Sequence, residues 1–261
     1  MTIEHLLLAS VAPEVPNFFT FISKTVNPYL GEKLVQWENI IFSLLAAGII
    51  SLFFHLGLKN YTHVPKGLQN FLEWVVEIIK KTILEILGPE GEKFIPFLGT
   101  LFLYILVMNW LVLIPFFRAP SSSFNVTLGI ALTVFAYVQY LNIKNFGFLG
   151  FLHHLAGAPK NLAGWILAPM MIILELITQV SRPFTLALRL FGNIYGEDIL
   201  IGTFSLFGVA LLAHFQTPIG LPLQVPFLLL AIFTGLLQAL VFTYLSTIYI
   251  LLSIPHSQED H

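Results

Sequence analysis

The stretch FIPFLGTLFLYILVMNWLVLIPFF, from Phe94 to Phe117, contains no charged residue. A helix needs about 20 mostly apolar residues to cross a bilayer, so this stretch is long enough to span one. The whole chain has the same character: 57% of its 261 residues are hydrophobic and only 10% are charged. So few charges cannot cover a soluble protein of this size, and a net charge of −2 offers no basic surface for nucleic acid. The composition therefore predicts an all-α integral membrane protein.

Further apolar stretches complete a set of five predicted transmembrane helices. The first spans 39–58, and residues 94–143 form a transmembrane hairpin whose second helix begins near Phe124. The last two helices form a long hairpin over 161–254, which is interrupted by the turn-like sequence QTPIGLPLQVP at 216–226. These two helices are longer than one perpendicular crossing requires, so we expect them to be tilted.

The segment 67–87 differs because Glu and Lys residues occur among apolar ones at helical spacing, which predicts an amphipathic helix on a membrane surface. Positively charged loops tend to remain on the inner side of a membrane, so the basic residues predict the orientation. The predicted inner side carries Lys59, Lys66, Lys80, Lys81, Lys93, Lys144 and Lys160. The opposite side carries only Lys24, Lys33 and Arg118. We therefore expect an exposed outer segment at 1–38, an inner-surface helix at 67–87 and a cytoplasmic tail at 255–261.

The fourth predicted span carries several ionisable residues, which are costly inside a membrane and indicate a function. They are Glu175, Arg182, Arg189, Glu197 and Asp198. At 100° per residue, one helical face carries a polar stripe made of Glu175, Thr178, Arg182, Thr185, Arg189 and Asn193. Arg189 is far from both helix ends and stays charged, so it can hold a fixed positive potential where a carboxylate must lose its proton.

The other polar residues of these helices also have structural explanations. Arg182 could extend to the inner surface, and Glu175 could pair with it. Glu197 and Asp198 could be solvated at the outer interface. Gln238, deep in the fifth span, could join two helices by hydrogen bonds or could orient the central arginine of the stripe.

The run SRPFTLALRLFGNIYGEDILIG, from Ser181 to Gly202, resembles the signature of subunit a of the F-type ATP synthase. LRLFGN is its most specific part, and the similarity covers nearly all of the chain after about residue 35, including 94–115, 120–132 and 233–250. The resemblance implies a non-catalytic, proton-conducting subunit beside a rotating ring of c subunits, assembled with the b-subunit stalk and the other synthase subunits. Sodium in place of the proton stays open, because the ring largely decides which ion is carried.

The resemblance also implies roles for single residues. Arg189 matches the family arginine that faces the ring carboxylates and separates two half-channels. We expect the outer half-channel to be lined by Asn193, Glu197, Asp198, Gln238 and His214. We expect the inner half-channel to be lined by Glu175, Thr178 and Arg182.

Two positions depart from the family pattern. Ser123 stands where an aspartate is frequent, and Ala231 stands where many bacterial members carry a histidine. We hypothesise that Glu197, which adds an acid beside Asp198, compensates for the group missing at Ala231.

The chain contains no Cys, and the adjacent His153 and His154 lack companion ligands, so we expect neither a cofactor nor a metal site. Without a transit peptide, a bacterial plasma membrane is favoured over an organelle inner or thylakoid membrane. Two other classes remain open from the residues alone: a secondary transporter or respiratory-complex proton-pumping subunit, and a structural membrane scaffold.

Overall fold

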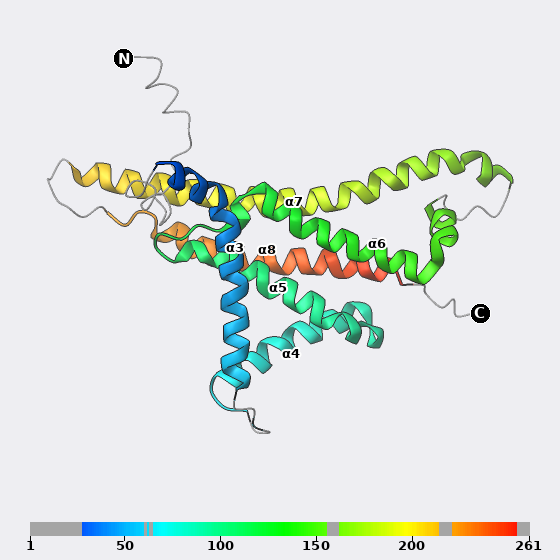
Figure 1. Cartoon of the computed structure of the whole chain (residues 1–261), viewed down its shortest axis with the longest axis horizontal. Coiled ribbons are helices and arrows are strands. Elements are labelled where there is room, and N and C mark those ends of the chain that lie inside the picture. The colour runs from blue at the N-terminus through cyan, green and yellow to red at the C-terminus, as the bar shows by residue number, and fades with distance from the viewer. Residues whose placement is uncertain (1–27, 60–61, 63–64, 156–161, 214–220, 255–261) are drawn as a thin grey trace, which may run out of the picture.

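The computed structural model describes residues 28–59, 62, 65–155, 162–213 and 221–254, and over these residues it is built from helices joined by turns (Figure 1). The helices are α3 (Pro28–Leu58), α4 (Leu68–Leu87), α5 (Ile95–Trp110), α6 (Phe124–Leu155), α7 (Leu162–Ala213) and α8 (Val225–Leu252). The short 3-10 turns are η1 (Pro89–Phe94), η2 (Leu111–Leu113) and η3 (Pro120–Ser122).

Five stretches of the described chain are long and apolar enough to cross a membrane. They are Trp37–Leu58, Pro89–Leu113, Phe124–Gly147, Leu167–Leu211 and Val225–Leu252. This confirms the prediction of an all-α membrane protein with five spanning helices. α3 already begins at Pro28, so the first helix extends beyond the span predicted from composition.

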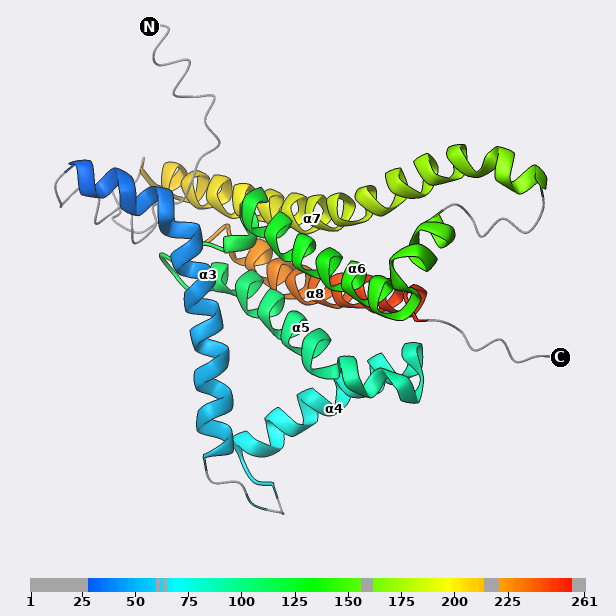
Figure 2. The same cartoon turned by 45° about the vertical axis from the view of Figure 1, so that its right-hand side comes forward.

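α4 is the amphipathic helix that the sequence predicts at 67–87. Its apolar residues Ile79 and Ile83 are buried against the other helices, whereas Lys80 and Lys81 are exposed. α4 runs from the end of α3 back to the start of α5 (Figure 2). It is not among the stretches apolar enough to span, which agrees with a surface helix.

In the core, side chains of α5 form hydrogen bonds with the backbone of α8 across an otherwise apolar interface. Asn109 is 1% exposed, donates to the Gly235 carbonyl at 3.1 Å and accepts from the Ser121 hydroxyl at 2.7 Å. The indole of Trp110 donates to the Ile232 carbonyl at 3.1 Å. A Cβ atom at Gly235 would lie only 3.2 Å from both Asn109 and Trp110, so glycine allows this close approach.

α7 forms a long hairpin with α8 and also packs against α6 (Figures 1 and 2). Pro169 and Pro183 lie inside α7, where each lacks the amide hydrogen of a regular helical bond and favours a bend. α6 changes direction at Gly147, whose φ of 68° and ψ of 166° suit only glycine. The contacts of α6 with α7 described below, such as that between Gln139 and Gln179, lie before this kink.

Candidate functional site

Arg189 lies near the middle of the 45-residue apolar part of α7. Its neighbours Leu186, Ala187 and Leu190 are buried, and they fix this face of the helix to the core. Arg189 and Asn193 lie on the exposed face, together with apolar side chains such as Leu188, which is 53% exposed. The structure thus presents a cation on an apolar surface that is open to a partner.

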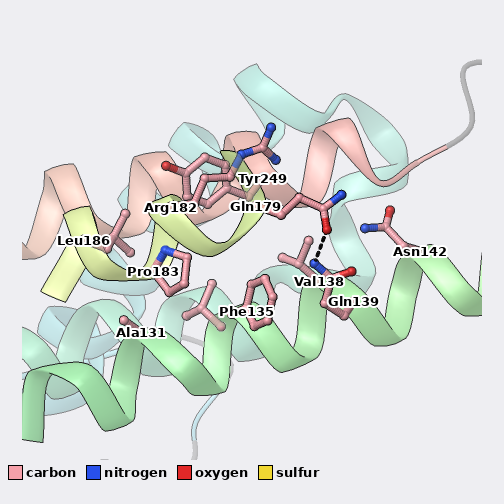
Figure 3. Close-up of a pocket in the computed structure, with 11 residues that line it drawn as sticks. Ala131, Phe135, Val138, Gln139, Asn142, Gln179, Arg182, Pro183, Leu186 and Tyr249 are labelled. Carbon is pink, nitrogen blue, oxygen red and sulfur yellow. Dashed lines mark hydrogen bonds between the residues drawn. The ribbon is translucent and has the colours of Figure 1, made fainter. Parts of the chain in front are cut away.

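Toward the start of α7, polar side chains meet where α6, α7 and α8 come together. We call this group the amide cluster, and it comprises Gln139 and Asn142 of α6, Glu175, Gln179 and Arg182 of α7, and Tyr249 of α8. Gln139 Nε2 donates to Gln179 Oε1 at 2.9 Å, and Gln179 Nε2 donates to Glu175 Oε1 at 3.3 Å. The guanidinium of Arg182 lies 5.3 Å from the centre of the Tyr249 ring, a cation–π contact (Figure 3).

A cavity of about 30 Å³ lies within the amide cluster. Its wall includes Gln139, Asn142, Gln179, Arg182 and Tyr249, beside apolar side chains of α6 and α7 (Figure 3). The cavity is therefore polar on one side and is large enough for one or two water molecules. Thr178 belongs to the polar stripe predicted from the sequence. Its side chain is exposed, and its hydroxyl donates a hydrogen bond to the Leu174 carbonyl at 2.8 Å.

Toward the end of α7, the two consecutive acids face different surroundings. Asp198 Oδ2 lies 3.4 Å from Arg118 Nε, and Arg118 Nη1 lies 3.2 Å from Glu38 Oε1. Glu38 is 3% exposed, so this bridge ties the start of α3 to α7 through the loop before η3. We call Glu38, Arg118, Glu197 and Asp198 the acid cluster.

Glu197 is 8% exposed and lies beside Thr234 of α8, whose hydroxyl donates to the Leu230 carbonyl at 2.9 Å. Thr234 follows Ala231 by three residues and therefore shares a helical face with it. Glu197 thus lies beside the part of α8 that contains Ala231, and the hypothesis that it compensates for a group missing there stays a prediction.

The remaining predicted site residues do not join either cluster through a described contact. Gln238 is half-buried on α8 and, within the described residues, forms no hydrogen bond with Arg189. His214 lies outside the described residues.

Six participants in these clusters were not candidates from the sequence: Gln139, Asn142, Gln179, Tyr249, Glu38 and Arg118. Gln139 and Gln179 are amides in apolar spans, and Gln179 follows Glu175 by one helical turn, so a signal for both was present. Glu38 lies one residue before the predicted first span, where a charge is expected to be solvated. Nothing in the sequence pairs it with Arg118, because this contact joins segments 80 residues apart.

The fold and these clusters define a multi-pass helical membrane protein with ionisable groups along one long spanning helix. The family model of the ATP synthase A chain matches residues 40–251. The ATP synthase subunit a of Protochlamydia amoebophila (strain UWE25) is 53% identical over 258 residues, which cover 98% of this chain and 95% of that protein. The corresponding subunit of Geobacter sp. (strain M21) is 35% identical over 243 residues, which cover 92% of this chain and 97% of that protein.

The chain therefore belongs to the ATP synthase A chain family, and it is a membrane subunit of the bacterial F-type ATP synthase complex. This confirms the resemblance carried by LRLFGN, Leu188 to Asn193. It also decides against a secondary transporter, a respiratory-complex subunit and a structural scaffold.

Proposed function

We propose that α7 and α8 form two offset half-channels that carry protons to and from the carboxylates of a c-subunit ring, with Arg189 facing the ring. The exposed position of Arg189, midway along an apolar spanning helix, carries this proposal. A cation facing hydrocarbon there costs about 2.5–3.5 kcal/mol even on the lenient insertion scales. A partner that covers this face with apolar side chains and a carboxylate removes that cost.

The outer half-channel reaches the ring through the acid cluster. Of the two adjacent acids, we assign proton exchange to Glu197, because Asp198 is engaged by the Arg118 guanidinium at 3.4 Å. Asn193, one turn from Glu197 and exposed on the ring-facing side, continues the path toward Arg189. Gln238 acts from α8 as a polar neighbour of this path.

The inner half-channel reaches the ring through the amide cluster, with Glu175 and Arg182 at its inner end and Thr178 on the exposed face. A ring carboxylate that has been neutralised on the outer side can rotate through lipid, whereas a charged one cannot do so cheaply. Near Arg189 the positive potential favours its ionisation, and the proton leaves through the inner side. Each proton contributes about 2.3 kcal/mol per 100 mV of membrane potential.

This proposal makes the chain a non-catalytic subunit that performs no covalent chemistry. We place it in a bacterial plasma membrane with the N-terminus outside, the C-terminus in the cytoplasm, and the b-subunit stalk and c ring as its partners.

Arg189→Ala tests this proposal in inverted membrane vesicles that contain the whole complex. We expect ATP-driven proton pumping to be lost while the complex still assembles, because the separation of the two half-channels depends on the charge. Leu188→Ala is the matched control, since it changes the adjacent exposed residue without a charge and should leave pumping intact. Coupled pumping that persists in Arg189→Ala would refute the role of the arginine.

A further inference from the structure

The amide cluster contains a directed chain of hydrogen bonds that ends on a carboxylate. Gln139 donates to Gln179, and Gln179 donates to Glu175, so both donors point toward Glu175. Figure 3 shows the two amide groups facing each other between α6 and α7. Carboxylate oxygens are hydrogen-bond acceptors, which agrees with the direction of this chain.

The other end of this chain is an unused acceptor. Gln139 Oε1 is buried, and no donor among the described residues lies within hydrogen-bonding distance of it. Buried polar atoms are nearly always hydrogen-bonded, and when no protein group is available the partner is commonly water. The cavity of about 30 Å³ adjoins Gln139 and can hold one or two water molecules.

One side of the cavity offers polar partners for water, whereas the rest of the wall is apolar. Asn142 follows Gln139 by three residues on the same face of α6, and Arg182 and Tyr249 complete the polar side of the wall (Figure 3). A water molecule needs two to four polar partners to remain in a buried site, and these side chains offer that number. Just before the Gly147 kink of α6, Asn145 donates to the carbonyl of Ser253 at the end of α8 at 2.9 Å, which holds the two helices together beside the site.

We propose that this cavity is a water-binding site of the proton path, in which Gln139 accepts a hydrogen bond from the bound water and Gln139 and Gln179 position it relative to Glu175 and Arg182. The inference rests on the proposed function and extends it, because it adds α6 to the wall of the inner half-channel. The two glutamines are positioning residues: their amides hold the water and the carboxylate in place and do not themselves carry the proton.

Reaction with silver ions tests whether water reaches Gln139. The chain contains no Cys, so Gln139→Cys introduces its only thiol. Silver binds the thiolate, which forms in aqueous surroundings, so we expect silver to inhibit proton flow in vesicles carrying Gln139→Cys. The matched control is Ala136→Cys, one turn earlier on an exposed part of α6, where silver should have no effect. Equal insensitivity of both variants would overturn the proposal.

A second pair of variants separates positioning from packing. Gln139→Met keeps the length of the side chain but removes the acceptor, and we expect proton flow per assembled complex to fall about fivefold, the factor typical of losing one hydrogen bond. Gln139→Glu keeps acceptor oxygens at the same reach but loses the hydrogen bond to Gln179, so it should retain more flow than Gln139→Met. Normal flow in Gln139→Met would contradict the proposal, and if that variant fails to assemble, the silver experiment decides.

The two proposals fail in different ways. If Arg189→Ala abolishes pumping while Gln139→Cys is insensitive to silver and Gln139→Met is normal, only the water site is wrong. If Arg189→Ala retains coupled pumping, the proposed function itself is wrong.

Discussion

The ion pairs of Arg118 allow a quantitative test of what holds the acid cluster together. Arg118→Leu removes a cation whose nitrogens lie 3.2 Å from Glu38 Oε1 and 3.4 Å from Asp198 Oδ2. At an effective dielectric constant of about 20, each contact contributes about 5 kcal/mol of Coulomb energy. Desolvation of the three charges offsets much of this, and Asp198 retains 21% side-chain exposure. We therefore expect removal of the cation to cost about 3 kcal/mol, the lower end for a broken buried pair.

Hydrogen–deuterium exchange of η3 in the purified complex measures this cost without an added probe. The amides of Ser122 and Ser123 form hydrogen bonds within the turn at 3.0 and 3.1 Å, and Arg118 Nε donates to Ser122 Oγ at 3.2 Å. Exchange at protected amides follows local opening. A cost of about 3 kcal/mol should accelerate exchange of η3 on the order of a hundredfold in Arg118→Leu. Arg182→Leu, which removes an arginine near the other end of α7, should leave this rate unchanged.

A double-mutant cycle tests whether Arg118 and Glu38 are energetically coupled. Adding Glu38→Gln to Arg118→Leu removes the carboxylate that the first change separates from the Arg118 guanidinium, so the double variant should recover part of the protection. If the free-energy changes of the single variants add to within about 0.5 kcal/mol, the two residues are not coupled and the reasoning is wrong.

Further predictions concern the two acids and two glycines. Glu197→Gln should lower proton pumping per assembled complex about a hundredfold, which is the scale expected when an acid–base group is lost. Asp198→Asn should chiefly lower the yield of assembled complex. Equal losses of pumping in the two variants would contradict this division of roles. Gly235→Val should lower the melting temperature of the complex, because overpacking against α5 costs about 1–3 kcal/mol, and an unchanged melting curve would argue against the close contact. Gly147→Ala should destabilise α6 by about 1–3 kcal/mol, because the positive φ of residue 147 is strained for alanine. Hydrogen exchange of the α6 amides measures this loss. Gly129→Ala is the control, because a Cβ atom there meets open space and should not destabilise the helix.

The spans and the polar stripe could be predicted from the sequence because both follow from local patterns. An apolar run of sufficient length defines a spanning helix, and a spacing of 100° per residue places Glu175, Arg182 and Arg189 on related faces. Both acids were expected at the outer interface, and the difference between the surroundings of Glu197 and Asp198 agrees with the divergence of consecutive helical side chains.

The partners of these residues could not be predicted, because they depend on how distant segments pack. The loop residue Arg118 looks like an ordinary outer charge until the fold brings it between α3 and α7. Gln139 looks like a single polar residue in an apolar span, and only the contact between α6 and α7 makes it the partner of Gln179. Sequence periodicity describes one helix at a time and contains no information on the rotation of its neighbours.

The two links that hold α7 lie at similar distances from Arg189. Asp198 is held by Arg118 about 14 Å along the helix in one direction, and Gln179 is held by Gln139 about 15 Å in the other. A sideways force applied at Arg189 is therefore shared between an ionic contact to the loop before η3 and an amide contact to α6. α7 is thus held by contacts on both sides of Arg189. These contacts oppose rotation of the helix about its own axis when a neighbouring surface exerts a force at its midpoint.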